Sequence, residues 1–374
     1  MSYELLRLTW WALLGALLVG FAVMDGFDLG SAILSPFVAK NDAERRQLLN
    51  TIGPVWEGNQ VWLIVGGGAT FAAWPTLYAA SFSGFYLAMF AVLAALIFRP
   101  LAIVYRSKIA DRRWRAWWDG VLFVTGLVPS IIFGVAFGNL FCGVPFGFDA
   151  DLRFQSQITL LGLLRPFPLA VGLTSLAMIA LHGSTWLSMK ADGTVGQRAR
   201  ALIPFLVAAF VVLFIADGVW LRALDGFNIA AGLAHDGPSN PVLKTVVRTG
   251  GGWFANYHAN PLLWLAPILA LLGALAATLL RSRPLVAFLG SALTAAATAA
   301  TAGLALFPFL LPSSSHPNAS LTVWDASSSK MTLAVMLAVT LFFLPLIVLY
   351  TGWVFRVMRG PVKAEDIAND HGAY

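Results

Sequence analysis

Charged residues are scarce in this sequence of 374 residues: only 11% are Asp, Glu, Lys or Arg, whereas 59% are hydrophobic. A soluble globular domain carries about 25% charged residues and covers its surface with them. This deficit excludes a water-soluble protein and predicts an integral membrane protein. The net charge of +6 does not indicate nucleic-acid binding, because the basic residues lie in the connections between apolar runs, where they set topology.

Cysteine and histidine are also rare. The single cysteine, Cys142, excludes an internal disulfide and any site built from several thiolates, such as an iron–sulfur cluster. Five histidines remain as candidate haem or metal ligands. Only His182 falls within an apolar run, and no predicted helix carries a second histidine one turn away. We therefore expect no metal site in this chain and no haem held by this chain alone.

Apolar runs of about 20 residues predict nine transmembrane helices. The runs lie near residues 8–36, 58–74, 78–98, 117–139, 157–182, 200–222, 261–280, 285–310 and 333–355. No soluble insertion separates them, so residues 1–374 are predicted to form one all-α membrane domain. The first run is too long for a cleavable signal peptide and carries two aspartates, so we expect the N-terminus to stay attached.

The basic residues are distributed unevenly between the two sides of this predicted bundle. Sixteen Lys and Arg residues fall on the side of residues 40–46, 106–115, 190–200, 281–283 and 356–363. Five fall on the opposite side: Arg7, Arg153, Lys244, Arg248 and Lys330. Since basic loops stay in the cytoplasm, the N-terminus is predicted outside and the C-terminus in the cytoplasm.

Several ionisable residues lie in or at the ends of the apolar runs, where a charge costs roughly 2.5–3.5 kcal/mol on insertion scales. Asp25 lies on the order of 26 Å along the first helix from its outer end, at 1.5 Å per residue. The other members should lie at similar depth, near the cytoplasmic edge: Asp28, Glu57, Arg99 and Asp119, with Trp56, Asn59 and Gln60 beside them. This layer is the candidate functional site.

Three interpretations of this layer stay open from the residues alone. The charges could form ion pairs that only hold helices together. They could hold water and relay protons, or they could contact a ligand. A second, weaker set towards the outside consists of Arg165 and Asp217, which we expect to pair across helices for structural reasons.

The order of the motifs resembles subunit II of the cytochrome bd-type quinol oxidases, a family that includes the cyanide-insensitive oxidases. The motifs cover essentially the whole chain: Phe21-Ala22-Val23-Met24-Asp25-Gly26-Phe27-Asp28, Trp56-Glu57-Gly58-Asn59-Gln60-Val61-Trp62-Leu63, Phe98-Arg99-Pro100, Gly134-Val135-Ala136-Phe137-Gly138-Asn139-Leu140, Pro312-Ser313-Ser314 and Asn318-Ala319-Ser320-Leu321-Thr322-Val323-Trp324-Asp325-Ala326.

This resemblance implies a multi-pass subunit of a respiratory terminal oxidase in the inner membrane of a bacterium, which oxidises quinol and reduces dioxygen to water. In the family the b- and d-type haems belong to subunit I, the expected partner, and subunit II supports it and supplies protons. The resemblance leaves open small accessory subunits, a bound structural quinone or lipid, which quinone is oxidised, and whether haem d is replaced by a further b-type haem.

The family's proton-delivery positions fall on Glu57 and Asp28. Some members carry Asp at the first position, so Glu57 keeps the carboxylate and adds a methylene group. By this resemblance, Glu57 and Asp28 would carry protons towards subunit I, Asp25 and Asp119 would support or feed them, and Arg99 would tune their pKa by its charge. This subunit would contribute no catalytic residue directly.

Two rival functions fit part of the same pattern. A secondary transporter would also carry intramembrane carboxylates and an arginine, but it predicts inverted repeats and unwound helices, which the sequence does not clearly show. A pure assembly scaffold within the oxidase would have the same motifs and no role in proton transfer.

Overall fold

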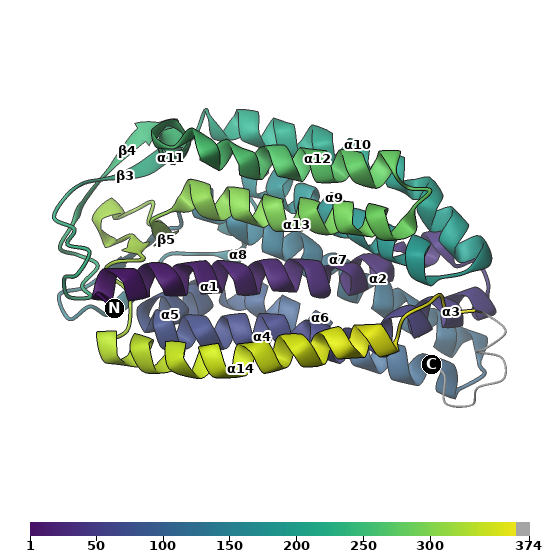
Figure 1. The fold of residues 1–374 in the computed structure, drawn as a ribbon. Helices are drawn as coiled ribbons and strands as arrows, with labels where there is room; N and C mark the ends of the chain where they lie inside the picture. Colours follow the sequence, from purple (N-terminus) through teal and green to yellow (C-terminus); the bar gives the residue numbers. More distant parts are fainter. Residues whose placement is uncertain (364–374) are drawn as a thin grey trace.

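The computed structural model describes residues 1–363, and in this part of the chain eight helices are long and apolar enough to cross a membrane. They run side by side as a single long bundle (Figure 1). The predicted all-α membrane fold is therefore confirmed. The N-terminus and the β-strands lie at one end of the bundle, and the connections rich in Lys and Arg lie at the other end (Figure 1).

The first predicted span is built from two helices, α1 (Tyr3–Met24) and α2 (Gly26–Val38). They meet at Asp25, whose backbone keeps a helical conformation with φ −81° and ψ −20°. The N–H of Asp25 still donates to the Phe21 carbonyl at 2.9 Å, so the chain crosses in one direction. The junction places an acidic residue at a point where the helix is interrupted.

The second and third predicted spans are α4 (Trp56–Ala73), followed by α5 (Pro75–Gly84) and α6 (Tyr86–Tyr105). Polar residues in the first turn of α4 lower its mean hydropathy, and it is not among the eight helices that qualify as spans. It nevertheless lies alongside α1 and α14 in the bundle (Figure 1). Helix α4 thus carries polar groups into an otherwise apolar assembly.

The remaining long helices are α7 (Arg112–Cys142), α9 (Pro166–Lys190), α10 (Gly193–Leu221), α12 (Leu265–Leu279), α13 (Pro284–Leu306) and α14 (Lys330–Val357). Several predicted bounds were wrong, and in two spans the reason is clear from the residues at the helix start. Residues 157–165 precede α9, which begins at Pro166, since proline fits the first helical position. Helix α10 begins seven residues earlier than predicted, where Asp192 caps it by accepting from the Gly193 N–H.

Short elements complete the chain. The short helices are α3 (Asp42–Ile52), α8 (Leu160–Leu163) and α11 (Ala255–Ala259), with 3₁₀ turns at Arg106–Lys108, Gly252–Phe254, Pro261–Trp264 and Pro317–Ala319. Three antiparallel pairs join β1 (Phe146–Phe148) to β2 (Phe154–Ser156), β3 (Asp225–Ala231) to β4 (Thr245–Gly250), and β5 (Phe309–Leu311) to β6 (Leu321–Thr322).

The crossing of α2 and α9 positions the candidate site. A Cβ on Gly30 would lie 2.1 Å from the Ile179 carbonyl oxygen, and one on Gly183 would lie 2.2 Å from the Gly30 carbonyl carbon. Only glycine therefore allows the two backbones to approach this closely, as is typical of packed membrane helices. The contact fixes the carboxylate-bearing start of α2 against the buried face of α9.

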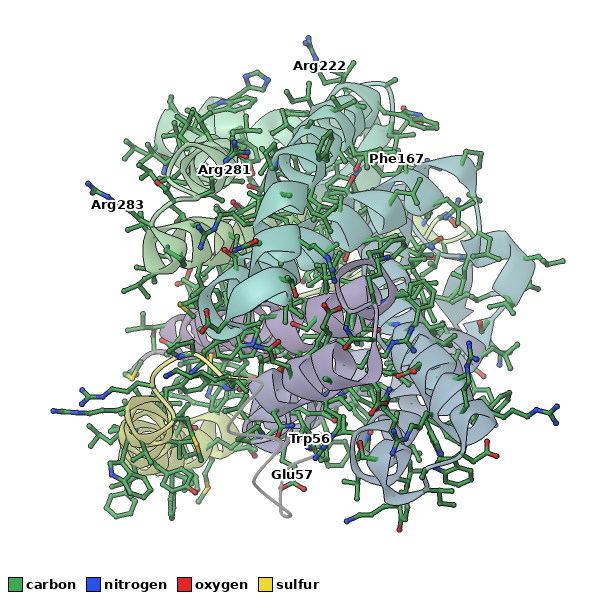
Figure 2. All side chains as sticks on the ribbon, turned by 90° about the vertical axis from the view of Figure 1, so that its right-hand side faces the viewer. Trp56, Glu57, Phe167, Arg222, Arg281 and Arg283 are labelled. Carbon is green, nitrogen blue, oxygen red and sulfur yellow. The ribbon has the colours of Figure 1, made fainter. Side chains whose placement is uncertain are left out.

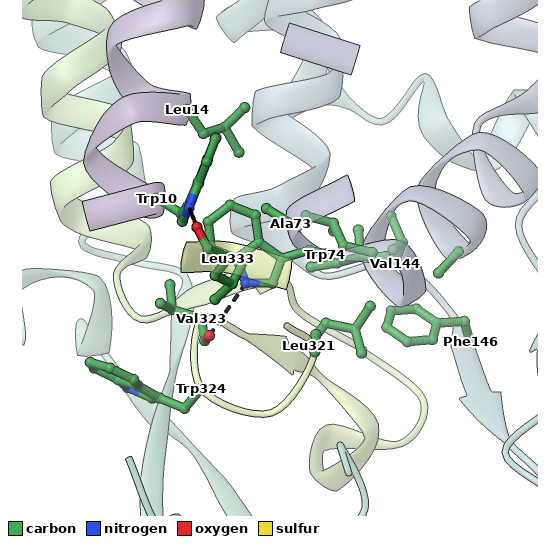
Figure 3. Close-up of a cluster of buried hydrophobic side chains, with 14 of the residues drawn as sticks. Trp10, Leu14, Ala73, Trp74, Val144, Phe146, Leu321, Val323, Trp324 and Leu333 are labelled. Atoms are coloured by element: carbon green, nitrogen blue, oxygen red, sulfur yellow. Dashed lines mark hydrogen bonds between the residues drawn. The ribbon is translucent and has the colours of Figure 1, made fainter. Parts of the chain in front are cut away.

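At the end of the bundle that carries the N-terminus and the β-strands, buried tryptophans form hydrogen bonds between chain segments that are distant in sequence. The Trp10 indole N–H donates to the Leu333 carbonyl at 2.9 Å, and Trp74 donates to the Val323 carbonyl at 3.3 Å (Figure 3). Both indoles are buried, and their donors find partners as buried tryptophans require. These bonds tie α1 and the start of α5 to the last third of the chain.

Candidate functional site

The centre of the site is an ion pair between Asp25, at the α1–α2 junction, and Arg99 of α6. The guanidinium donates from Nη1 to Oδ2 at 3.0 Å and from Nη2 to Oδ1 at 2.7 Å. Both side chains are completely buried. A two-bond geometry of this kind is the strongest form of an arginine–carboxylate contact and offsets part of the cost of burying the charges.

Helix α4 supplies two amides to the same place. The Gln60 side-chain oxygen accepts from Arg99 Nη2 at 2.8 Å, and Asn59 Nδ2 donates to Asp28 Oδ2 at 2.8 Å. Asp28 is also fully buried. The expected layer therefore holds Asp25, Asp28, Arg99, Asn59 and Gln60 together, from three segments of the chain. Of the two aspartates, Asp25 is the one that binds the arginine.

Asp28 differs from Asp25 in that one of its oxygens is left over. Within residues 1–363, Asp28 Oδ1 is buried and has no hydrogen-bond partner. An unpaired buried oxygen costs about 1–3 kcal/mol or more, so its presence needs a reason. A proton or a water molecule on this oxygen would satisfy it. The geometry thus offers one position in the buried group where a proton can be taken up or released.

Glu57 lies on a different face of α4. It is exposed on this chain, and Val61 and Ile64, which follow it at helical spacing, are exposed too. Figure 2 looks onto the end of the bundle that carries the basic loops and shows Trp56 and Glu57 side by side at its lower edge. Trp56 is half-buried. The carboxylate of Glu57 therefore points away from the buried group, along an apolar outer face.

Asp119 belongs to a second group of charges, near the same end of the bundle. It accepts from Arg106 Nε at 2.6 Å and is bonded to Arg45 of α3. Arg106 also pairs with Asp42 at 2.9 Å, and Asp42 pairs with Arg115 at 2.7 Å. Asp119 therefore does not join the buried group: its contacts are with basic residues of the loop ends, not with Asp25, Asp28 or Arg99.

Sequence reasoning missed the role of His182, which lies more than a full turn inside α9 and is completely buried. Its Nε2 lies 2.8 Å from the Val23 carbonyl oxygen, and its Nδ1 lies 2.8 Å from Ser291 Oγ. A backbone carbonyl only accepts, so Nε2 carries the hydrogen. The Val23 carbonyl belongs to the turn that ends α1, which means that His182 braces the junction at Asp25.

The second expected pair, Arg165 with Asp217, is not formed. Arg165 Nη2 donates to Asn139 Oδ1 at 3.1 Å and to the Gly143 carbonyl at 3.0 Å. Asp217 accepts from the Thr174 hydroxyl at 2.5 Å. Spacing along each helix fixes depth but not the direction in which a side chain points, so matched depth did not mean contact.

A buried pair outside the spans was also missed. Lys244 Nζ lies 2.7 Å from Asp325 Oδ2, and both side chains are almost completely buried. Burial lowers the pKa of Lys244, although the negative charge of Asp325 works in the opposite direction. Burial likewise raises the pKa of Tyr257 to about 12. Lys244 lies after a polar loop, and Asp325 lies in the segment that follows β6. No sequence pattern linked the two residues.

Metal ligands do not gather in the described part of the chain: residues 1–363 contain no group of three or more His, Cys, Asp or Glu side chains that could hold a metal ion. The two ring nitrogens of His182 are both engaged. The site itself holds one ion pair, one partly unpaired carboxylate and one outward-facing carboxylate, groups that can take part in acid–base chemistry.

Comparison with known proteins places this arrangement in a family. The family described as cytochrome bd terminal oxidase subunit II matches residues 6–358. The chain is 47% identical to the cytochrome bd-I ubiquinol oxidase subunit 2 of Escherichia coli K12, with all of both chains covered. It is 31% identical to the cytochrome bd ubiquinol oxidase subunit 2 of Bacillus subtilis, covering 96% of this chain and 97% of the relative.

A solved structure shares the fold. The bd oxidase from Geobacillus thermodenitrificans contains a chain that matches with a TM-score of 0.67 at 16% identity, covering 94% of this chain and 98% of that one. At this identity the likeness speaks for the fold alone, while the sequence matches over the full length speak for the family. The chain is therefore a multi-pass membrane protein that belongs to the cytochrome bd terminal oxidase subunit II family.

Proposed function

We propose that this chain, as subunit II of a quinol:dioxygen oxidoreductase, delivers protons from the cytoplasm to a haem-bearing subunit I. The observation that carries the proposal is the buried carboxylate of Asp28, with one oxygen bonded to Asn59 and the other without a partner in the described chain. Oxygen reduction consumes protons. A membrane subunit that supplies them needs an ionisable group inside the bundle that is not locked into an ion pair.

The Asp25–Arg99 pair supports this role by keeping a positive charge next to the buried carboxylates. An opposite charge close by favours the ionised form of an acid, which opposes the effect of burial. Asp25 takes up most of that charge through its two bonds. Asp28 is left outside the ion pair and bonds only to the Asn59 amide in the described chain, so its carboxyl group is the member of this group that is free to exchange a proton.

Glu57 fits the exit of the route. A carboxylate on an apolar outer face is costly against lipid but not against a partner subunit with polar groups. We assign the face of α4 that carries Glu57, Val61 and Ile64 to the contact with subunit I. Asp119 is paired with Arg45 and Arg106 near the same end, so we leave it outside the route and assign it to holding the loop ends together.

If quinol releases its protons outside while dioxygen takes protons from the cytoplasm, turnover builds a proton motive force without a pump. This assigns the basic end of the bundle to the cytoplasm, with the N-terminus outside, in a bacterial inner membrane. In this proposal residues 1–363 bind no haem. The b- and d-type haems stay in subunit I, and no accessory subunit or quinone is required by the residues described.

The test is Glu57→Gln in the assembled oxidase, with Glu44→Gln as the matched control at the same end of the bundle. We expect turnover with quinol to fall at least tenfold in the first variant and to stay near that of the parent enzyme in the second, with haem content unchanged in both. Unchanged turnover at full haem content would remove Glu57 from the route. Loss of haem would assign it to assembly, the scaffold alternative.

A further inference from the structure

Arg165, which the proton route does not use, lines a partly open cavity at the end of the bundle that carries the β-strands. The cavity measures about 140 Å³ and is lined by Val144, Pro145, Gln157, Ile158, Thr159, Gly162, Leu163, Arg165 and Ser314. It lies between the β1–β2 hairpin, α8 and the loop after β5. Its volume is several times the ~30 Å³ that one water molecule occupies in the liquid, which leaves room for a phosphate group.

The charge of Arg165 is only partly used by the protein. Its Nη2 donates hydrogen bonds to two neutral oxygens, those of Asn139 and Gly143. Within the described residues, Arg165 Nε is buried without a partner, and Nη1 donates to no protein atom. An arginine held in place by neutral groups at the membrane boundary lacks a counter-charge, and an anion would supply one.

The polar groups around the arginine suit an anion with several oxygens. Gln157, Ser314 and Thr159, which carry an amide and two hydroxyls, are among the residues that line the same cavity. These are donors that complement an arginine at a phosphate, because the planar guanidinium matches phosphate geometry. No carboxylate is among the lining residues of this cavity.

Exposed leucines lie on the two helices that contribute to the cavity or begin beside it, α8 and α9. Leu161 of α8 is 81% exposed, and Leu169 and Leu173 lie one turn apart on α9 and are exposed as well. Exposed apolar side chains next in sequence to a phosphate-sized, cationic cavity fit a molecule with a charged head and hydrocarbon tails. This pairing favours a lipid over a free anion.

We propose that the Arg165 cavity binds the phosphate of a phospholipid from the leaflet on this side, with its acyl chains along Leu161, Leu169 and Leu173. The bound lipid neutralises Arg165 and packs against the start of α9. The inference does not depend on proton transfer, since the cavity and the buried carboxylates lie towards opposite ends of the bundle.

Native mass spectrometry of the purified two-subunit oxidase tests this proposal. The delipidated complex is incubated with phosphatidylglycerol, and the number of bound lipids is compared between the parent enzyme, Arg165→Gln and the control Arg153→Gln. Arg153 is 75% exposed and pairs only with an exposed aspartate in the described chain. We expect Arg165→Gln to weaken the tightest lipid binding at least tenfold and Arg153→Gln to leave it unchanged.

A second variant protects the test against misfolding. Ser314→Leu fills the cavity while leaving the arginine in place, and it should abolish the same binding event with the haem-to-protein ratio unchanged. Equal lipid retention in all variants would overturn the proposal. So would equal binding of an uncharged diacylglycerol, which would indicate an acyl groove alone, or full displacement by inorganic phosphate, which would indicate a site for a free anion.

Discussion

Two groups of charges lie towards the basic end of the bundle, and they are built differently. Around Asp25 and Asp28, two buried carboxylates share one arginine, and one carboxylate oxygen is left without a partner in the described chain. Around Asp119, two carboxylates face three arginines and the group is partly exposed. The first group carries a buried excess of acid, and the second is a surface network with more positive than negative charge.

We infer from this difference that the group around Asp25 and Asp28 has a functional role, whereas the group around Asp119 has a structural one. Surface ion pairs contribute little each, with a median near 0–1 kcal/mol, and tolerate the loss of one member. A buried pair loses about 3–5 kcal/mol when one partner is removed, because the other charge is left uncompensated. Asp28 combines an ionisable group, complete burial and an oxygen without a partner in the described chain, so the first group is where we expect proton chemistry.

The largest effect should come from Arg99→Gln. This change leaves Asp25 buried without its counter-charge and should destabilise the subunit by about 3–5 kcal/mol. The oxidase should fail to assemble, measured as a fall in the haem-to-protein ratio of the purified complex. The double variant Arg99→Gln with Asp25→Asn should restore much of the assembly. If the single variant assembles normally, the Asp25–Arg99 ion pair is not required for the stability of the buried group.

Sequence reasoning found the members of the buried group but not their pairing. Hydropathy and helical rise gave the depth of Asp25, Asp28 and Arg99, because depth depends only on position along a helix. Which aspartate binds the arginine depends on helix rotation and on the glycine contact between α2 and α9, which involves residues about 150 positions apart. The outward direction of Glu57 depends on rotation too.

The partners of Asp119 and His182 could not be predicted either, because they too depend on how distant segments pack in the fold. The residues of α3 were interpreted as part of a polar connection between spans. Arg45 of this helix was therefore not predicted to bind Asp119. His182 looked like a single histidine in an apolar run, and its partner is a backbone carbonyl, which leaves no trace in side-chain chemistry. Contacts to the backbone and across distant loops need the fold before they can be seen.

The next largest effect should come from His182→Leu, which tests the role of the α1–α2 junction at Asp25. His182→Leu removes the donor to the Val23 carbonyl and leaves that carbonyl and Ser291 to find other partners, at a cost of about 1–3 kcal/mol. The melting temperature of the purified complex should fall, and the quinol oxidase activity per haem should fall with it. His182→Gln, which keeps a donor, should recover part of both. If His182→Leu keeps the stability and activity of the parent enzyme, the hydrogen bond from His182 to the Val23 carbonyl is not important for either.

The direct comparison of the two groups is Asp28→Asn against Asp119→Asn. Asparagine keeps the size of the side chain and removes the ionisable proton. We expect Asp28→Asn to reduce turnover at least tenfold, about 1.4 kcal/mol of activation free energy, and Asp119→Asn to reduce it less than twofold. Stopped-flow proton uptake by the reconstituted complex provides the measurement. Equal losses in both variants would merge the two groups into one route.

The smallest effect concerns Glu44, which joins α3 to α10 and serves as the control above. Partial burial works to raise the pKa of Glu44, but hydrogen bonds from the Lys40 N–H, Arg198 and Thr194 outweigh it and lower the pKa. A lowered pKa means stability that is present above the ordinary value of 4.5 and is lost as the pH falls through the folded value. Glu44→Gln should therefore cost less than about 1 kcal/mol at neutral pH, with the difference vanishing in acid. Thermal denaturation of the complex at pH 7 and at a pH below the folded pKa of Glu44 measures this, and a difference that persists at the lower pH would mean that hydrogen bonding, not charge, holds this contact.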